Sequence, residues 1–319
     1  MSAANIENAV VLACDACYLP YALYAAQQIA VAHPQRCFDV IVFCSDAATL
    51  PPALQKIGVT LQHLDGDNPF AQDPNAGRHG HAAYLRLLLP ARALGRYRRL
   101  LYLDSDIVLN RPGLERLFGA DLRGAALGAV RDNQQWRTPG RRVKEFKTLG
   151  LPASPYFNSG VLLIDVERYV GDGVLEACLK RFVEQPQALL RHDQSLLNLV
   201  LKDRWTELSP VWNWQYTWSS RFFADLADPQ LIHFIGPRKP WKDSTHALPA
   251  RFRQGYAAFL AQHFPALDGA RLGAPGIGWP DGLWRVFIKH ALAAAPMKRY
   301  LDRFGGDTVT YGGAQSPGS

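Results

Sequence analysis

The stretch Arg99-Leu-Leu-Tyr-Leu-Asp-Ser-Asp-Ile-Val-Leu109 places two aspartates, Asp104 and Asp106, between two apolar runs. The first run has the length and composition of a buried β-strand, so both carboxylates follow the carboxyl end of that strand. Ligands of open α/β sheets bind outside the carboxyl ends of the strands. Two carboxylates one residue apart repel each other unless a cation lies between them, and Mg²⁺ and Mn²⁺ prefer such oxygen ligands. A turn with two solvated aspartates is the alternative, and the apolar flanks favour the metal site.

Strand and helix patterns alternate on both sides of this stretch. Short apolar runs predict strands at residues 9–14, 38–44, 59–64, 99–103, 126–130, 160–165 and 231–235. Helix-forming segments lie at residues 21–32, 52–57, 84–89, 174–183, 194–201 and 252–263. The alternation predicts an α/β fold with a mostly parallel sheet, in one catalytic domain over residues 1–263.

A second candidate ligand segment is Leu231-Ile-His-Phe-Ile-Gly-Pro-Arg-Lys-Pro-Trp241. His233 could complete the metal site, whereas a lone histidine in an apolar run is more often part of the core. Gly236 lets the backbone approach a ligand closely, and Lys239 offers a point charge to phosphate. A simple turn would also explain the glycine, and a solvated surface charge would explain the lysine. Together the three residues suit a site for a metal-bound diphosphate.

The C-terminal part of the chain has a different composition. Residues 264–282 are rich in Pro and Gly and predict a linker, residues 283–304 are basic and aromatic, and residues 305–319 predict a disordered tail. If 283–292 is helical, one face carries Leu283, Trp284, Phe287, Ile288, Ala291 and Leu292. Arg285 and Lys289 lie on the other face, and Pro296 is expected to interrupt the helix. The pattern favours a helix at an anionic bilayer surface over one packed on the catalytic domain with a solvated basic face.

Composition sets wider limits. The chain has 319 residues and a formal net charge of +7, which suggests an anionic partner without choosing between nucleic acid, membrane and phosphorylated substrate. No run is long enough to span a bilayer, and the start lacks the basic region of a signal peptide, so we expect a cytoplasmic protein. The 5 cysteines lack framework spacing, which predicts reduced thiols. The pair Cys14-Asp-Ala-Cys17 lacks further zinc ligands, which favours simple packing.

An ordered set of segments resembles family 8 of the retaining glycosyltransferases, most closely the bacterial lipopolysaccharide galactosyltransferases and glucosyltransferases. Order and spacing agree over roughly residues 8–245, at Leu12-Ala-Cys-Asp15, Tyr84-Leu-Arg86, Leu101-Tyr-Leu-Asp-Ser-Asp106, Tyr156-Phe-Asn-Ser-Gly-Val-Leu-Leu-Ile-Asp165, His192-Asp-Gln-Ser-Leu-Leu-Asn198 and His233-Phe-Ile-Gly-Pro-Arg-Lys-Pro-Trp241. The resemblance implies a GT-A fold, a Rossmann-like α/β domain that uses a nucleotide sugar and Mn²⁺, with Mg²⁺ possible.

The resemblance also implies three groups of site residues. The metal ligands would be Asp104, Asp106 and His233. The donor would be held by Ala13, Asp15, Arg86, Ser105, Asp132, Gly236 and Lys239. The residues around the reacting anomeric carbon would be Asn158, Asp193 and Gln194. Within the donor group, the family pattern places Gly236 and Lys239 at the diphosphate, Asp15 and Ala13 at the uracil, and Arg86 and Asp132 at the sugar.

Taken singly, some of these residues could have purely structural roles. Asp132 could form a turn, Asn158 could cap a strand end, and Asp193 could cap a helix. The chain also departs from the family in two places. Cys17 stands where relatives often carry Asn, and Ser195 stands where some relatives carry an acid. The second departure weakens the hypothesis that this position supplies a carboxylate nucleophile. It favours front-face attack by the acceptor hydroxyl.

The expected activity is transfer of galactose or glucose from a UDP-sugar to an acceptor glycan, expected to be lipopolysaccharide, lipooligosaccharide or another lipid-linked saccharide. We expect peripheral binding to the cytoplasmic face of the inner membrane and no nucleic-acid partner. A competing hypothesis is a nucleotidyltransferase that makes a nucleotide sugar, although the acidic segment 14–17 lacks its Gly-rich basic loop. The sequence also leaves open a non-catalytic basic binding module and a self-glycosylating primer protein.

Overall fold

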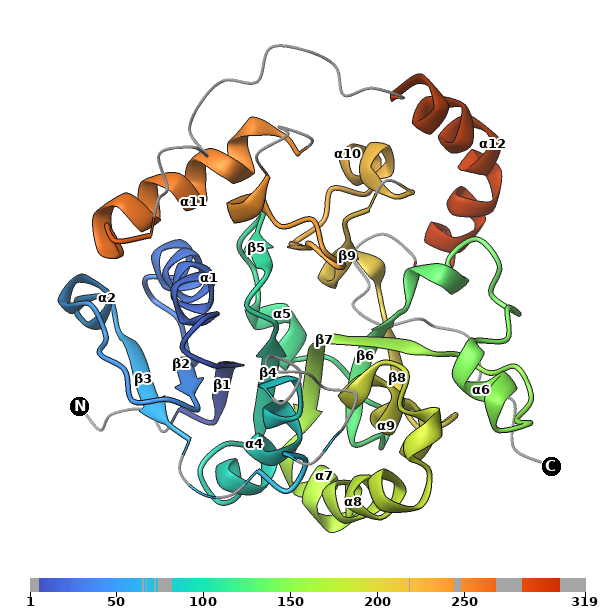
Figure 1. The fold of residues 1–319 in the computed structure, drawn as a ribbon, viewed down its shortest axis with the longest axis horizontal. Coiled ribbons are helices and arrows are strands. Elements are labelled where there is room, and N and C mark those ends of the chain that lie inside the picture. Colours follow the sequence, from blue (N-terminus) through green and yellow to red (C-terminus); the bar gives the residue numbers. More distant parts are fainter. Residues whose placement is uncertain are drawn as a thin grey trace.

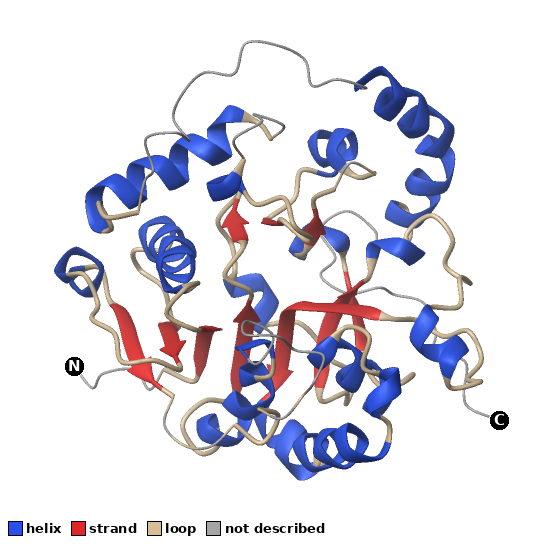
Figure 2. Cartoon of the chain, viewed as in Figure 1, coloured by secondary structure: helices blue, strands red, loops and turns tan. Residues whose placement is uncertain are grey.

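The computed structural model describes residues 6–304 except 65, 67, 72, 74–81, 218, 244–247 and 268–282. Most of the predicted linker and the whole predicted tail therefore lie outside the described residues. In the described part, a seven-stranded sheet has the order β3-β2-β1-β4-β7-β6-β8 (Figures 1 and 2). Its strands are β1 (Asn8–Cys14), β2 (Asp39–Cys44), β3 (Val59–His63), β4 (Arg99–Leu103), β6 (Leu127–Arg131), β7 (Phe157–Asp165) and β8 (Thr206–Leu208). Neighbouring strands pair in parallel except around β7, which is antiparallel to both β4 and β6.

Helices cover both faces of this sheet, as Figure 2 shows. The α-helices of the described part are α1 (Leu19–Ala32), α2 (Pro52–Lys56), α4 (Leu85–Ala93), α5 (Glu115–Phe118), α6 (Lys144–Thr148), α7 (Val166–Gly171), α8 (Val174–Glu184), α9 (His192–Val200), α10 (Ala224–Ala227), α11 (Ala250–His263) and α12 (Leu283–Leu301). The predicted α/β architecture is confirmed, and each predicted strand and helix has a counterpart whose bounds differ by a few residues. The helical segment predicted to begin at residues 84–89 is α4, which continues through Pro90 to Ala93.

Two hydrophobic cores lie on opposite faces of the sheet. In β1, Val10 and Leu12 belong to the core that includes α1 and α11, whereas Ala9 and Val11 belong to the core under α4, α7, α8 and α9. This alternation is the period-two pattern of a strand that is buried on both faces. A register slip of one residue would exchange the two faces, so the two cores together fix where each strand ends.

A small second sheet was not predicted as a unit. It has the order β5-β10-β9, formed by β5 (Ile107–Leu109), β10 (Leu231–His233) and β9 (Trp214–Gln215). Strand β10 is antiparallel to β5, and the register pairs His233 with Ile107. Sequence patterns predicted only β10, because the other two strands are too short to show a period. The pairing brings His233 beside Asp106, far away along the chain.

Helix α12 packs on the domain through one face. Its buried side chains are His290, Ala293, Met297, Tyr300 and, just beyond its end, Phe304. The Tyr300 ring stacks on Trp136 with centroids 5.8 Å apart, and the His290 ring stacks on Phe223 at 4.8 Å. In Figure 1 the helix flanks the end of the molecule that holds β6 and β9.

The expectation that Pro296 interrupts this helix was wrong, because α12 runs through Pro296 to Leu301. A proline inside a helix removes the hydrogen bond to the carbonyl four residues earlier, here that of Leu292. Leu292 is 79% exposed, so it lies on the solvent side of the helix. We infer that water can satisfy its freed carbonyl, which lowers the cost of the break.

A cluster of charges around Glu207 fastens α12 to the sheet. Arg131, the last residue of β6, makes a paired contact with Glu207 through Nε at 2.8 Å and Nη2 at 2.6 Å. Arg303 Nη2 donates to the same carboxylate at 3.0 Å, and the Tyr300 hydroxyl donates to it at 3.3 Å. The side chains of Arg131 and Glu207 are 7% and 9% exposed, so their charges depend on each other rather than on water.

Replacing Glu207 with alanine should loosen this attachment, because Arg131 and Arg303 would lose their shared counter-charge. Removing one partner of a buried ion pair typically costs about 3–5 kcal/mol. We expect a melting temperature lower by several degrees and faster cleavage of α12 in limited trypsin digestion. The variant Glu167→Ala removes an exposed carboxylate from α7 and is the matched control. Equal protection of α12 in both variants would contradict the role given to Glu207.

Candidate active site

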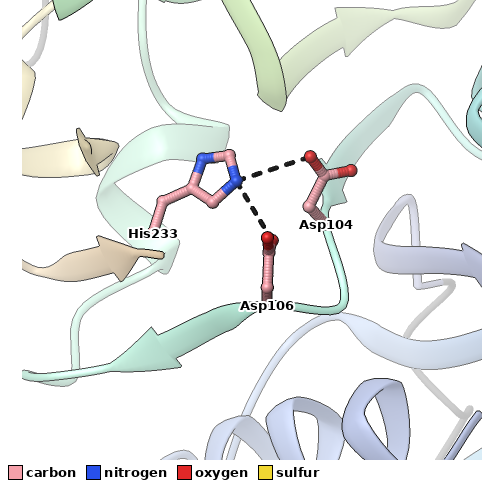
Figure 3. A group of neighbouring side chains, drawn as sticks. All are labelled: Asp104, Asp106 and His233. Carbon is pink, nitrogen blue, oxygen red and sulfur yellow. Dashed lines mark ion pairs between the residues drawn. The ribbon is translucent and has the colours of Figure 1, made fainter. Parts of the chain in front are cut away.

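Three of the predicted residues form a cluster beyond the carboxyl end of β4. His233 Nε2 lies 3.0 Å from Asp106 Oδ1 and 3.5 Å from Asp104 Oδ2 (Figure 3). One ligand atom from each residue lies within 4.8 Å of the others. One cation with bonds of about 2.1 Å could join these atoms after small side-chain adjustments. Two carboxylates and one imidazole suit a divalent cation such as Mn²⁺ or Mg²⁺.

The surrounding backbone is arranged around this cluster. The Asp104 N–H donates to the Gly160 carbonyl at 2.8 Å, and the Phe234 N–H donates to the Asp106 carbonyl at 3.1 Å. A Cβ atom on Gly160 would lie 2.2 Å from His233 Cε1 and 2.7 Å from Asp104 Oδ2. Only glycine therefore leaves room at this point of β7 for the imidazole and the carboxylate together.

One atom of the cluster supports a cation independently of the sequence pattern. Asp106 Oδ1 is buried and makes no hydrogen bond among the described residues. His233 Nε2, 3.0 Å away, could donate to it only if the imidazole were protonated. A buried acceptor left without a partner typically costs about 1–3 kcal/mol. A bound cation would supply the missing partner, so the residues present fit a metal site.

Lys239 lies next to the cluster, as its segment predicted. Its ammonium contacts the Asp106 carboxylate and lies 2.6 Å from the Phe234 carbonyl oxygen. Burial alone would raise the pKa of the Asp106 carboxyl, but the contacts with His233 and Lys239 outweigh burial and hold this pKa below its usual range. Gly236 has φ of +81°, in the left-handed region that favours glycine, and makes the turn between His233 and Lys239.

Arg86 of α4 joins two acidic residues of the site. Its Nη2 lies 2.9 Å from Asp104 Oδ1, and its Nε lies 3.1 Å from Asp193 Oδ2. Nη1 donates to the Ser159 carbonyl at 2.7 Å. Burial raises the pKa of the Asp193 carboxyl, and the Arg86 charge opposes this shift. The guanidinium thus supplies a fixed counter-charge between the metal cluster and α9.

The side chain of Gln194 is held on both sides. Its Oε1 accepts from Asn158 Nδ2 at 3.1 Å and from the Ser159 N–H at 3.3 Å. Its Nε2 donates to Asp132 Oδ2 at 3.1 Å, and the same oxygen accepts from Arg191 Nη1 at 2.8 Å. These contacts bring together Asn158, Gln194 and Asp132, three residues that the family resemblance places near the reacting sugar.

The remaining donor candidates border two cavities. A cavity of about 150 Å³ is lined by Ala13, Arg86, Asp104, Ser105 and Asp106, among others. A larger one of about 460 Å³, which shares Ala82 with the first, is bordered by Asp15. Asp15 also accepts the Tyr18 N–H at 2.9 Å before the start of α1, so part of its role is structural.

Sequence reasoning missed several residues around the site. Glu145 of α6 is buried and accepts from the Tyr156 hydroxyl at 3.0 Å and from Ser195 Oγ at 3.5 Å. The carboxylate of Glu145 therefore contacts Ser195, the position where some relatives carry an acid and this sequence does not. The Arg191 side chain lies 2.8 Å from Asp132 and 3.6 Å from Glu145. Neither residue belongs to a motif, so the sequence carried no signal for them.

Asn213 was also missed. Its Oδ1 lies 2.9 Å from His233 Nδ1, and its Nδ2 donates to Asn158 Oδ1 at 2.8 Å. It lies between two tryptophans in a segment without regular period, which offers no sequence signal for contact with a metal ligand.

A mostly parallel α/β sheet with an acidic cluster beyond its strand ends is the architecture of the GT-A glycosyltransferases. Solved structures agree with this class. The galactosyltransferase LgtC, in complex with donor and acceptor sugar analogues, superposes with a TM-score of 0.61 at 22% identity, over 79% of this chain and 95% of that one. The bifunctional glycosyltransferase WbbM in its apo form superposes with a TM-score of 0.65 at 19% identity, over 85% of this chain and 52% of that one.

The family model "Glycosyl transferase family 8" matches residues 9–245, and the chain belongs to this family. General stress protein A of Bacillus subtilis (strain 168) is 28% identical, with 60% of this chain and 70% of that protein covered. The lipopolysaccharide glucosyltransferase WaaO of Escherichia coli (strain K12) is 26% identical, with 60% of this chain and 58% of that protein covered. The lipopolysaccharide 1,3-galactosyltransferase of Salmonella typhimurium is 25% identical, with 53% and 51% covered.

The room left by Gly160 gives a test of the metal cluster. If the cluster binds Mn²⁺, the ion should raise the melting temperature of the unsubstituted protein, because a ligand that binds only the native state stabilises it. Gly160→Ala should displace His233 and abolish this rise. Gly140→Ala is the matched control, since a Cβ at Gly140 meets no atom within 4 Å. A Gly160→Ala protein with an unchanged Mn²⁺-dependent shift would argue against the cluster as the metal site.

Proposed function

We propose that this chain moves galactose or glucose from a UDP-sugar to an acceptor glycan, with retention at the anomeric carbon and with Mn²⁺ as the preferred cation. The observation that carries the proposal is the cluster of Asp104, Asp106 and His233 with Lys239 beside it. It lies outside the carboxyl ends of the strands, where open α/β sheets bind ligands. Family membership supports the reaction class, and LgtC was solved with donor and acceptor sugar analogues.

On the donor side, we place the diphosphate between the metal cluster and Lys239. The ammonium of Lys239 and the backbone at Gly236 would bind its oxygens. We assign the uracil to the larger cavity beside Asp15. Ala13 and Ser105 line the smaller cavity, which we place between the uracil and the diphosphate. When bound, a divalent cation would stabilise the negative charge that develops on the leaving UDP.

At the reacting carbon, Gln194 is a poor nucleophile, and its amide is already held by Asn158 and Asp132. The carboxylate of Asp193 is paired with Arg86. We therefore propose front-face attack. The acceptor hydroxyl oxygen bonds to the anomeric carbon as the carbon–phosphate oxygen bond breaks, and the bonding electrons leave with UDP. The hydroxyl proton passes to the departing phosphate oxygen, so the product keeps the donor's anomeric configuration.

The acceptor is proposed to be lipopolysaccharide, lipooligosaccharide or another lipid-linked saccharide. Two similar proteins, from Escherichia coli and Salmonella typhimurium, are named for transfer to lipopolysaccharide. A mostly apolar cavity of about 340 Å³, lined by Tyr216, Gly236 and Pro237, adjoins the diphosphate segment, and we place part of the acceptor there.

The function is tested by release of UDP from a panel of UDP-sugars with mixed acceptor glycans, first with Mn²⁺ and then with EDTA. We expect release from one sugar, loss with EDTA, and a fall of at least about 100-fold in Asp106→Ala, the usual size when a group that stabilises transition-state charge is removed. Asp225→Ala, which removes an exposed carboxylate from α10, should behave like the unsubstituted protein. The product's anomeric configuration, read by NMR, checks retention, and an inverted product would exclude the front-face step. No release from any donor would refute the proposed activity.

We also propose that α12 binds the surface of an anionic membrane at the cytoplasmic face. Its outer face leaves Trp284, Phe287, Ile288 and Leu292 exposed by 62%, 66%, 47% and 79%, while the opposite face is buried on the domain. The exposed Arg285 and Lys289 flank this apolar strip. Apolar side chains flanked by basic ones are the pattern of helices that lie in a bilayer interface. Among the described residues, no helix has the length and apolar content needed to cross a bilayer.

Vesicle sedimentation tests this surface. The triple variant Trp284→Ser, Phe287→Ser, Leu292→Ser should lose binding to vesicles that contain anionic lipid, and should keep its activity on a soluble acceptor. The control Val183→Ser, Leu226→Ser removes two side chains of similar exposure, 77% and 78%, from α8 and α10. High salt should weaken binding of the unsubstituted protein, because attraction between Lys or Arg and anionic lipid is screened. Equal sedimentation of both variants would refute the proposed surface.

A further inference from the structure

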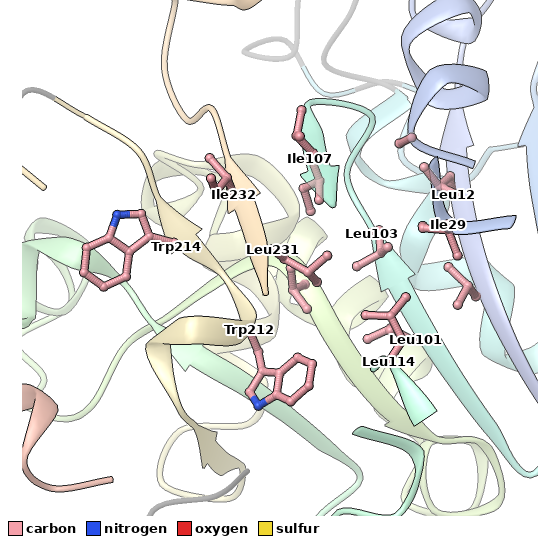
Figure 4. Close-up of a cluster of buried hydrophobic side chains, with 14 of the residues drawn as sticks. Leu12, Ile29, Leu101, Leu103, Ile107, Leu114, Trp212, Trp214, Leu231 and Ile232 are labelled. Carbon is pink, nitrogen blue, oxygen red and sulfur yellow. The ribbon is translucent and has the colours of Figure 1, made fainter. Parts of the chain in front are cut away.

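Asn213 lies at the centre of a buried chain of polar groups that joins the metal cluster to the residues near the reacting carbon. Its side chain is 0% exposed, and its neighbours Trp212 and Trp214 are buried at 1% and 0%. Figure 4 shows the two tryptophans near Leu231 and Ile232, the residues that lead into His233, and Trp214 pairs with Ile232 in the small sheet. The amide of Asn213 therefore forms no hydrogen bonds with bulk water, and its orientation depends on its protein partners.

One backbone group sets the direction of each hydrogen bond in the series that runs from Asn158 through Asn213 to His233. The Gly160 N–H donates to Asn158 Oδ1 at 3.1 Å, which fixes that atom as the amide oxygen because a nitrogen could not accept. Asn158 Oδ1 then also accepts from Asn213 Nδ2 at 2.8 Å. Because the amide nitrogen of Asn213 faces Asn158, the amide oxygen of Asn213 must face His233, where it lies 2.9 Å from Nδ1.

An oxygen at that position can only accept, so Nδ1 of His233 carries a proton. In a neutral imidazole the other nitrogen, Nε2, then has a free lone pair. Nε2 is the atom that faces Asp104 and Asp106, at 3.5 Å and 3.0 Å. Three acceptor atoms thus point at one place, as metal coordination requires.

We infer that Asn213 is a positioning residue that fixes the tautomer and the ring orientation of His233 for a divalent cation. The inference rests on the metal site of the proposed function. A hydrogen bond from the second ring nitrogen of a metal-binding histidine typically changes metal affinity by about 10–100-fold when it is lost. Asn213 makes this bond with an uncharged oxygen, so it orients the ring without adding a negative charge to a site that already has two.

The same series of hydrogen bonds continues toward the residues proposed to surround the reacting carbon. Asn158, which receives the bond from Asn213, donates to Gln194 at 3.1 Å, and Gln194 donates to Asp132 at 3.1 Å. Asn213 therefore holds His233 with its oxygen and the Asn158–Gln194 pair with its nitrogen. The two functions can be separated, because Asn213→Asp keeps an acceptor for His233 and removes the donor to Asn158, whereas Asn213→Leu removes both.

The experiment combines two measurements on the full chain. NMR of protein labelled with ¹⁵N-histidine, without metal, looks for an exchange-protected Nδ1–H signal of His233. Titration with Mn²⁺, followed by the EPR signal of the free ion, gives the metal affinity. We expect the Nδ1–H signal in the unsubstituted protein and in Asn213→Asp, and its loss in Asn213→Leu. We expect Mn²⁺ affinity to fall about 10–100-fold in Asn213→Leu and to stay within tenfold in Asn213→Asp, whose kcat should nevertheless fall.

The control is Asn110→Leu. Asn110 follows β5 in the same small sheet, and its amide donates to the Pro229 carbonyl at 2.8 Å, away from His233. A general loss of stability would lower the melting temperature of both leucine variants, but only Asn213→Leu should lose the His233 signal and Mn²⁺ affinity. An Nδ1 without a proton in the unsubstituted protein, or an Asn213→Leu protein that binds Mn²⁺ with unchanged affinity, would overturn the inference. If the unsubstituted protein binds no Mn²⁺, the proposed metal site fails, while the Nδ1–H signal and its dependence on residue 213 still decide whether Asn213 orients His233.

Discussion

The pairing of β10 with β5 is the constraint on which the site depends. Each strand has three residues, and the antiparallel register places His233 opposite Ile107, next to Asp106. So short a pairing has little stability of its own, and burial of the strand residues holds it in place. Leu231 and Ile232 are 0% exposed, and Ile107 is 1% exposed. The hydrophobic core thus determines where the imidazole of a distant segment meets the two carboxylates.

The charges around this junction balance only as a group. Two carboxylates and an imidazole in a buried place are costly without positive charge, and Arg86 and Lys239 supply it from two different segments. Arg86 is held by several fixed acceptors, whereas Lys239 lies at the end of the turn that begins after His233. Under the proposed function, a cation bound to Asp106 would replace the ammonium as its counter-charge. Lys239 would then be free to bind the diphosphate that arrives with the metal, so one short segment could serve both partners.

The sequence predicted the parts of this arrangement that leave local patterns. Alternating strands and helices gave the fold, and the run from Arg99 to Leu109 placed Asp104 and Asp106 at a strand end. The presence of His233 beside them was predicted from Gly236 and Lys239 in the same segment and from the family resemblance. Asn213 could not be predicted, because its role follows from the register of β9 and β10, and strands of two and three residues have no detectable period. Glu145 and Arg191 were missed for a related reason, since contacts across the fold decide their roles. The course of α12 through Pro296 depends on which side of the helix faces solvent, and that is settled by packing rather than by the proline itself.

The attachment of α12 bears on how a membrane-bound enzyme would reach its acceptor. The helix is joined to the rest of the chain through residues 268–282, which lie outside the described part, yet its inner face is fixed by Glu207. Glu207 in turn holds Arg131, the residue directly before Asp132 in the sequence. The proposed membrane-binding helix α12 and the candidate sugar-binding residue Asp132 are therefore fixed to the same strand end. A helix fastened in this way would set one orientation of the active site relative to the bilayer, whereas a helix on a free linker would allow many. Binding to a lipid-linked acceptor would then carry a smaller orientational cost, because the protein would already face the membrane in one geometry.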